Sequence, residues 1–344
     1  MASLDVSKAF DRVNHFALFV KLIGLGIPLY ILNVLINWHC KLLGCVRWLG
    51  ALSGVFAVKS GVRQGGILSP WLFNVYVNGL ISRLRNSGVG CYIFYAFIGC
   101  IFFADDMLLL SGSILHLQIL LNICVDYGLD FDLTFNASKS FLIQFGLVNS
   151  NTLPVLSLGA GCLHWVERIK YLGVWLVEGK CFKVDCDVNR TKFLGSVFGI
   201  MQRCSKVSEE ILWNIISKCC LPTLLYGVDS LSLRVDQVHK LSVALNLAIR
   251  RCFHLAKNVS VRNLLYFVGC MPMKMLLDER IVKLVKSCFN GSEVLRLCAR
   301  IRSADESFQE VCYMYDVHCE MSGDRVSQNF RNYLFLRLRD EGKL

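Results

Sequence analysis

The sequence is poor in charge and contains no long uninterrupted apolar run. Charged residues make up 18% of the 344 residues and hydrophobic residues 54%, so most of the chain can bury a core, which excludes general disorder. The most apolar run, residues 91–104, is 14 residues long and ends at Asp105 and Asp106. Because a membrane-spanning helix needs about 20 apolar residues, this run predicts a buried strand pair or a core helix, and no membrane partner.

The sequence also lacks a Cys-x-x-Cys pair and a secretory leader. Its 17 cysteines are scattered, which argues against a zinc site or a redox pair. The closest cluster, Cys312 with His318 and Cys319, lacks a fourth ligand at a suitable spacing. No basic region followed by an apolar stretch stands at the N-terminus. We therefore expect buried free thiols and an intracellular, reducing location in the nucleus and cytoplasm, without secretion.

Positive charge is unevenly distributed along the chain. The formal net charge is +11, and residues 181–300 contain 18 Lys and Arg against 9 Asp and Glu. Residues 111–180 are nearly neutral, with 4 basic and 5 acidic residues. Such a basic block suits a partner with a phosphate backbone. A solvated basic surface with no partner is the alternative interpretation.

Hydrophobic spacing predicts alternating strands and helices in the first half and helices in the second. Ser69 is expected as the N-cap of a helix with Pro70 at its first position. The expected elements are a strand over 1–6, helices over 7–22 and 28–38, a strand pair over 44–60, a helix over 70–85, two apolar runs over 91–111, a helix over 113–127, strands over 140–145 and 171–176, and helices from about 185 onward. The change in pattern predicts a domain boundary near residue 180.

Two adjacent acids, Asp105 and Asp106, stand among eight apolar residues in the segment 101–110. In a continuous strand one of them would point into a packed face, whereas at a hairpin tip both can project from the sheet. No Lys or Arg occurs from Gly88 to Ser138, so the pair either protonates or recruits a cation. A simple Asp-Asp turn remains the alternative.

A third acid, Asp5, stands at the end of the first predicted strand, immediately before a helix. An aspartate in that position is often a helix N-cap. Together with the acidic pair it becomes a candidate metal ligand. Three carboxylates from two strand ends can hold two Mg²⁺ ions, which activate an attacking 3′-hydroxyl and stabilise a leaving pyrophosphate.

Five segments, in order along residues 4–176, resemble the palm motifs of reverse transcriptases from non-LTR (LINE-type) retrotransposons. They are Leu4–His15 (LDVSKAFDRVNH), Arg63–Phe73 (RQGGILSPWLF), Phe103–Asp106 (FADD), Asn136–Lys139 (NASK) and Tyr171–Gly173 (YLG), and Leu221–Gly227 extends the likeness. The resemblance implies an α+β fold: a right-hand polymerase palm, with a ferredoxin-like antiparallel sheet covered by helices on one face, over residues 1–180. A basic, mainly helical thumb over 181–300 and a helical extension over 301–344 follow.

By this resemblance the chain is an RNA-directed DNA polymerase, a nucleotidyltransferase with two Mg²⁺ ions as cofactors, or Mn²⁺ in their place. Its partners are an RNA template, a DNA primer and dNTPs. The implied roles are metal binding by Asp5, Val6, Asp105 and Asp106, nucleotide binding by Phe10, Arg63, Gln64 and Gly65 with Gly66 beside them, pyrophosphate protonation by Lys139, and a primer grip by Tyr171, Leu172 and Gly173. For Phe10 this role is a steric gate against a 2′-hydroxyl. A core aromatic at residue 10, a plain turn at 61–66 and a solvated Lys139 are the alternatives.

The sequence departs from the family pattern in three places. Phe103 stands where tyrosine is common, and the thumb stretch Tyr226–Leu231 lacks the usual Glu and Trp. The first motif begins at residue 4, so the basic strands that precede it in the family are missing from this chain. We therefore expect the chain alone to polymerise poorly or not at all. A catalytically silent nucleic-acid-binding remnant and a group II intron-type maturase are the alternative functions.

Overall fold

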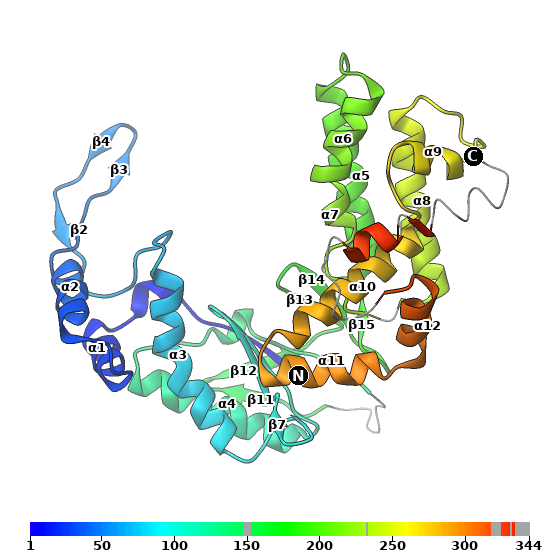
Figure 1. Cartoon of the computed structure of the whole chain (residues 1–344). Coiled ribbons are helices and arrows are strands. Elements are labelled where there is room, and N and C mark those ends of the chain that lie inside the picture. The colour runs from blue at the N-terminus through cyan, green and yellow to red at the C-terminus, as the bar shows by residue number, and fades with distance from the viewer. Residues whose placement is uncertain (147–152, 232, 318–324, 331, 334–344) are drawn as a thin grey trace. The chain divides into compact units, whose positions relative to one another are not determined.

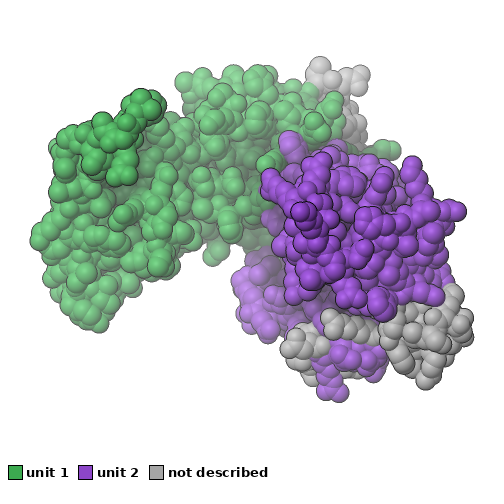
Figure 2. Space-filling view, turned by 90° about the horizontal axis from the view of Figure 1, so that it is seen from above, with its two compact units in different colours: residues 1–172, 178–182 green, residues 173–177, 183–344 purple. Residues whose placement is uncertain are grey.

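The structure is a computed structural model that describes residues 1–146, 153–231, 233–317, 325–330 and 332–333. The chain divides into two compact units (Figure 2). The first comprises Met1–Leu172 with Glu178–Phe182, and the second comprises Gly173–Val177 with Lys183–Leu344. The boundaries placed at 180 and 300 on the sequence stay predictions.

The first unit holds thirteen strands among the residues described and four α-helices (Figure 1). Its strands are β1 (Ala2–Asp5), β2 (Leu43–Gly44), β3 (Arg47–Trp48), β4 (Ala51–Leu52), β5 (Phe56–Ala57), β6 (Tyr92–Ile93), β7 (Ala96–Phe97), β8 (Cys100–Phe103), β9 (Asp106–Leu109), β10 (Phe141–Leu142), β11 (Leu156–Leu158), β12 (Gly161–Trp165) and β13 (Arg168–Tyr171). Its helices are η1 (Ala9–Arg12), α1 (His15–Gly24), α2 (Leu29–Cys40), α3 (Ser69–Asn86), α4 (Ile114–Asp130) and η2 (Ala137–Lys139), of which η1 and η2 are 3-10 turns.

A six-stranded sheet in the order β11-β12-β10-β1-β9-β8 forms the centre of this unit. All its pairings are antiparallel except that of β10 with β12. Strand β1 alternates as a half-buried strand should, with Ala2 and Leu4 fully buried and Ser3 and Asp5 partly exposed. Helices α3 and α4 pack against each other, α3 also contacts α1, and α4 contacts β11. Their apolar sides and the inner face of the sheet share one core.

Two helix starts differ from the sequence-based expectation. The helix predicted over 7–22 is broken: Lys8 has a left-handed backbone (φ 51°), η1 ends at Arg12, and Asn14 caps α1 by accepting the N–H of Ala17 at 3.2 Å. Ser69 is the first residue of α3 rather than its N-cap, because its hydroxyl donates to the carbonyl of Arg63 instead of accepting a helix N–H.

Two strand predictions are also wrong in detail. The strand predicted over 171–176 is interrupted after Tyr171, because Leu172 and Gly173 both have positive φ (46° and 83°) and the chain turns there into β14. The strand predicted over 140–145 is only two residues long, β10. The apolar run at 91–104 forms strands but is only partly buried: Phe94 lies in the β6–β7 connection and Phe103 on the edge strand β8, and both side chains are exposed.

The second unit is helical beyond a short strand pair. It contains β14 (Val174–Val177), β15 (Lys183–Val184), α5 (Cys186–Arg203), α6 (Glu209–Cys219), α7 (Leu221–Leu224), α8 (Val235–Cys252), α9 (Arg262–Phe267), α10 (Met273–Phe289), α11 (Glu293–Ser303) and α12 (Glu306–Met314). One core is built mainly by α5, α6, α7 and α8. A second core joins α10, α11 and α12 to Val326 and Phe330.

The apolar composition serves these cores. Among the described residues, no helix is both long and apolar enough to cross a bilayer. All 16 described cysteines are free thiols, but only Cys124, Cys186, Cys220, Cys252 and Cys270 are buried, so the expectation of buried thiols holds for a minority. His318 and Cys319, from the cluster noted with Cys312, lie outside the described residues.

Candidate active site

Asp5 and Asp106 face each other across two neighbouring strands. Strand β1 pairs antiparallel with β9, and the register sets Leu4 opposite Met107 and Asp5 opposite Asp106. Directly opposite residues in an antiparallel pair have Cα atoms about 4.5–5.5 Å apart. The two acids, a hundred positions apart in sequence, thus end adjacent strands of the same sheet. The predicted proximity of these two residues is observed.

Asp105 lies in the turn of the hairpin that carries Asp106. Strands β8 and β9 pair with Phe103 opposite Asp106, which leaves Ala104 and Asp105 as a two-residue turn. Ala104 has a positive φ of 54°, a conformation that costs an L-residue with a Cβ free energy. The turn keeps both acids out of the core, and both are exposed. Of the two geometries considered on the sequence, the structure has the hairpin tip.

The three carboxylates are uncompensated by basic groups. Among the described residues, no ion pair involves Asp5, Asp105 or Asp106. Partial burial first, then the negative charges of Asp105 and Asp5, raise the pKa of the Asp106 carboxyl. A divalent cation would relieve this repulsion, and three carboxylates form the oxygen donor set that Mg²⁺ and Mn²⁺ prefer.

The side chains of this acid cluster do not converge in the conformations present. Within the described ranges, no group of three or more His, Cys, Asp or Glu side chains is arranged to hold a metal ion. The backbone register fixes the neighbourhood of Asp5 and Asp106, and rotation about their side-chain bonds decides whether the oxygens meet. The chemistry of the donor set therefore fits a divalent cation, while the rotamers present do not form a closed site.

The segment after α4 holds Asp5 in place from the side opposite β9. The buried Ser140 hydroxyl accepts the backbone N–H of Asp5 at 3.1 Å and donates to the carbonyl of Asn136 at 2.7 Å. The N–H of Asn136 donates to the carbonyl of Asp5 at 2.9 Å. Val6 and Phe135 form an isolated antiparallel β-bridge next to this bond. Sequence reasoning missed Ser140, although a serine directly after the fourth motif was a visible signal. Lys139, in the same turn, is exposed.

Phe10 and the loop at 61–66 form a second group within the same unit. Phe10 is half-buried and stacks on Phe73 of α3, with ring centroids 5.0 Å apart. The Gln64 amide donates to the Asp11 carboxylate at 3.2 Å. Gly61 has φ +90°, and a Cβ there would stand 2.9 Å from backbone atoms of Asp11 and Phe10. Only glycine allows this close approach, which fixes the loop against η1.

This loop borders an open hollow. The hollow measures about 590 Å³ and is lined by Asp11, Leu42, Leu43, Val58, Ser60, Gly61, Val62, Arg63 and Gln64. Arg63, Gln64 and Gly65 are exposed, and Gly65 has φ +78° with no atom within 4 Å of the place its Cβ would take. The loop thus offers a guanidinium, an amide and an open backbone to a ligand.

Tyr171 connects the end of β13 to the acidic hairpin. Its hydroxyl donates to the carbonyl of Ile101 in β8 at 3.4 Å. Burial first, then the negative charge of Asp106, raise the pKa of Tyr171 to about 12. The turn that follows, Leu172–Gly173, has positive φ at both positions, as a type I′ turn requires. The structure therefore brings Asp5, Asp106 and Tyr171 together. Arg63 and Gln64 line the hollow, whereas Phe10 does not line it and stacks on Phe73.

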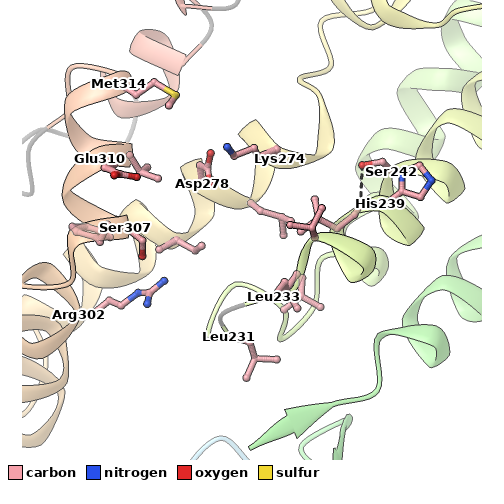
Figure 3. Close-up of a pocket in the computed structure, with 17 residues that line it drawn as sticks. Leu231, Leu233, His239, Ser242, Lys274, Asp278, Arg302, Ser307, Glu310 and Met314 are labelled. Atoms are coloured by element: carbon pink, nitrogen blue, oxygen red, sulfur yellow. Dashed lines mark hydrogen bonds between the residues drawn. The ribbon is translucent and has the colours of Figure 1, made fainter. Parts of the chain in front are cut away.

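A larger cavity, about 620 Å³, lies inside the second unit (Figure 3). It is lined mainly by apolar side chains with Lys274, Asp278, Arg302 and Glu310. Lys274 and Asp278 both come from α10. The Asp278 carboxylate already accepts the Tyr315 hydroxyl at 3.2 Å. Its lining mixes both signs of charge and contains no adjacent acids, so the carboxylate chemistry belongs to the hairpin and not to this cavity.

Comparison with known proteins identifies the family of this chain. The family described as reverse transcriptase (RNA-dependent DNA polymerase) matches residues 1–176, just over half of the chain. That range contains β1, the acidic hairpin, the loop at 61–66 and Tyr171.

Curated relatives include three products of mobile elements. The Pol polyprotein of the type-1 retrotransposable element R2 from Popillia japonica is 27% identical over 264 residues, covering 74% of this chain and 36% of that protein. The Pol polyprotein of the type-2 element R2DM from Drosophila melanogaster is 33% identical over 182 residues, 51% of this chain and 17% of that protein. The RNA-directed DNA polymerase from the mobile element jockey of Drosophila funebris is 26% identical over 52% of this chain.

The chain thus spans about a third of the first relative and less of the other two. Among solved structures, telomerase from Candida albicans in complex with a fragment of telomeric RNA covers 90% of this chain and 50% of its own, at a TM-score of 0.42 and 13% identity. At that TM-score the likeness does not by itself establish a shared fold.

Proposed function

The chain belongs to the reverse transcriptase (RNA-dependent DNA polymerase) family, and from that premise we propose that it is the RNA-directed DNA polymerase segment of a non-LTR retrotransposon product. One observation carries the proposal: Asp5 and Asp106 are register partners at the ends of β1 and β9, with Asp105 in the adjoining turn. The curated relatives are mobile-element products, which favours this reading over a group II intron-type maturase.

Asp5, Asp105 and Asp106 would hold two Mg²⁺ ions, or Mn²⁺ in their place, with the Val6 carbonyl as a further ligand. Bound there, such ions activate the primer 3′-hydroxyl and stabilise the leaving pyrophosphate. The chain's own contribution is to keep three acids together without a basic neighbour. Ser140 and Asn136 hold the backbone of Asp5 in place through their hydrogen bonds.

The hollow at 61–66 would take the incoming dNTP. Arg63 supplies a positive charge for its phosphates, and the open backbone at Gly65 allows close approach. The Gln64–Asp11 hydrogen bond holds the loop against η1. Stacking on the fully buried Phe73 restrains the Phe10 ring, so that the ring can exclude a 2′-hydroxyl by steric clash.

The remaining residues would serve the nucleic acid. Tyr171, Leu172 and Gly173 would hold the primer terminus, and Lys139, exposed at the end of η2, would supply a proton to pyrophosphate. The 18 Lys and Arg of residues 181–300 would contact the backbone of the template–primer duplex. We also propose an intracellular, reducing location in the nucleus and cytoplasm, which the free thiols suit.

Primer extension on an RNA template tests this function. Purified chain, Mg²⁺ and all four dNTPs are expected to give slow extension that Asp105→Asn abolishes while template binding is retained. Exposed Asp126 of α4 provides the matched control, because Asp126→Asn should extend like the parent. Extension that persists in Asp105→Asn would refute the assigned carboxylates.

A catalytically silent nucleic-acid-binding protein is the second candidate. It is favoured by the side chains of the acid cluster, which form no closed metal site in the conformations present. Binding of template–primer by this chain without any metal-dependent nucleotide addition, at any Mg²⁺ or Mn²⁺ concentration, would favour this alternative.

A further inference from the structure

Between the first acid motif and the acidic hairpin, the chain has no negative side chain at all. Residues 12–104 contain no Asp or Glu, and eight basic residues: Arg12, Lys21, Lys41, Arg47, Lys59, Arg63, Arg83 and Arg85. A surface with one sign of charge favours a polyanionic partner. Part of this segment packs into the core through α1 and α3, and part of it does not.

The part that does not is residues 41–60, which we call the arm. It is a narrow hairpin beyond α2, with β2 paired to β5 and β3 paired to β4 (Figure 1). Nearly all of its residues are exposed, including Trp48 (75%), Leu49 (94%), Val55 (69%) and Phe56 (50%). Such a row of large apolar side chains on an isolated hairpin contributes little to folding and marks an interaction surface.

The tip of the arm is a two-residue turn between β3 and β4. Trp48 is opposite Ala51, and the two residues between them, Leu49 and Gly50, have φ values of 47° and 86°. A leucine in the left-handed region is strained, and Leu49 gains no burial in return. Positive φ at both positions is what a type I′ turn between antiparallel strands requires, and this turn leaves the Leu49 side chain exposed at the tip.

The base of the arm borders the hollow already assigned to the nucleotide. Leu42, Leu43 and Val58 line that hollow together with Arg63 and Gln64. The arm therefore begins at the wall of the proposed nucleotide site and extends away from it. Its three basic residues, Lys41, Arg47 and Lys59, lie at the base and near the tip, with exposed apolar and aromatic side chains between them.

We propose that the arm binds the single-stranded RNA template ahead of the nucleotide site, with Trp48 stacking on an unpaired base and Arg47 contacting the phosphate backbone. The inference rests on the proposed function for the identity of the strand. Exposed aromatic side chains interleaved with basic ones are the usual means of binding single strands without sequence preference. A basic protein surface is a poor partner for the arm, because the arm has no acidic residue to pair with it. An uncharged protein surface would leave the three basic residues of the arm without a specific role.

Fluorescence anisotropy on the full chain, without dNTPs, tests the proposal. The two probes share one labelled duplex: one has an RNA template overhang of about ten nucleotides and the other is blunt. Trp48→Ala is expected to weaken binding of the overhang probe about tenfold, the effect of losing one base–aromatic stack, and to leave the blunt probe unchanged. Trp48→Phe should retain most of the affinity. Arg47→Gln should make the slope of log affinity against log salt concentration shallower by about one for the overhang probe, because one phosphate contact is lost.

Tyr313→Ala is the matched control, because Tyr313 in α12 is 91% exposed and lies in the other unit. Equal overhang affinity in Trp48→Ala and Tyr313→Ala would overturn the proposal, as would an equal loss on both probes. If Trp48→Ala changes the sedimentation coefficient of the protein but leaves its RNA affinity unchanged, the proposal is also overturned. The arm would then be an interface between copies of this chain. Failure of the polymerase assignment is read separately, from extension in Asp105→Asn, which these binding measurements do not use.

Discussion

The Ser140 hydroxyl links the fourth motif to Asp5: it accepts the Asp5 backbone N–H at 3.1 Å and donates to the Asn136 carbonyl at 2.7 Å. Ser140 is fully buried, so water cannot take the place of either hydrogen-bond partner of its hydroxyl. The bond fixes the end of β1, where the candidate metal ligand stands. A short polar side chain thus sets the position of a carboxylate 135 residues away in sequence.

Ser140→Ala should therefore impair both folding and the site. Removing the hydroxyl takes away the partner that the structure gives the Asp5 N–H, at a cost of about 1–3 kcal/mol for a buried donor. Urea denaturation should show that loss, and primer extension should fall with it. Ser82→Ala, which removes an exposed helical hydroxyl bonded to the Asn78 carbonyl, is the control and should change stability by less than about 0.5 kcal/mol. Equal stability of the two variants would contradict the role given to Ser140.

Ala104→Gly should not destabilise the protein. Ala104 has φ 54° in the turn of the β8–β9 hairpin, a conformation that glycine adopts without a Cβ clash. Relief of that strain is partly offset by the greater entropy of glycine in the unfolded chain, so we expect a gain between zero and about 1 kcal/mol. Ala104→Val should lose stability, because a β-branched residue tolerates positive φ poorly. Thermal unfolding of the three proteins decides, and a less stable Ala104→Gly protein would rule out this turn geometry.

Gly61→Ala should disturb the loop beside the nucleotide hollow. The added Cβ would stand 2.9 Å from the Asp11 Cα and from the Phe10 and Asp11 carbonyl oxygens, at φ +90°. We expect a loss of roughly 1–3 kcal/mol and a higher KM for dNTP, since Phe10 and Gln64 would shift. Gly54→Ala, in the arm, meets no atom within 4 Å and should be nearly neutral. A Gly61→Ala protein with unchanged stability and KM would show that the loop is not packed against η1.

The acid cluster should make folding stability depend on pH and on Mg²⁺. Burial, Asp105 and Asp5, in that order, raise the pKa of Asp106, so the folded protein holds this proton more tightly than the unfolded chain does. Stability from this group is present below the unfolded pKa and falls as pH rises through the folded pKa. At pH 7.5 without metal, Asp106→Asn should therefore be the more stable protein.

With Mg²⁺ present, the parent should become more stable than Asp106→Asn. Mg²⁺ should raise the Tm of the parent at pH 7.5, because binding to the folded state alone stabilises it. The rise should shrink as pH falls through the raised folded pKa of Asp106 and should be absent in Asp106→Asn. Differential scanning fluorimetry with a Ca²⁺-free Mg²⁺ titration measures both effects. A Tm rise of equal size in Asp106→Asn would place the Mg²⁺ elsewhere.

The elements with a regular hydrophobic periodicity were predictable from the sequence. The first strand, α2, α3 and α4 follow from hydrophobic spacing, and the acidic hairpin follows from the cost of burying either Asp105 or Asp106 in a continuous strand. Local spacing could not show the break before α1. Lys8 adopts a left-handed conformation, and Phe10 and Asp11 then pack against Gly61, a contact some fifty residues away.

The site was predictable in composition and less so in arrangement. The resemblance supplied Asp5, Asp105, Asp106, Phe10 and Gln64, whereas the Gln64–Asp11 and Ser140–Asp5 hydrogen bonds depend on tertiary packing and have no local signature. Leu172 shows the same limit. A leucine with positive φ contradicts its own backbone preference, so a strand was expected where the chain turns.

Mn²⁺ binding followed by electron paramagnetic resonance tests the central claim, that the acids from β1 and from the β8–β9 hairpin share metal ions. Titrations of the parent, Asp5→Asn, Asp106→Asn and the control Asp126→Asn, each with template–primer duplex present, would compare the two sides of the site directly. We predict Mn²⁺ binding that falls about tenfold or more in Asp5→Asn as well as in Asp106→Asn, and stays unchanged in Asp126→Asn. Parent-like affinity in Asp5→Asn would contradict the account, because the acid on β1 would then have no part in the metal site.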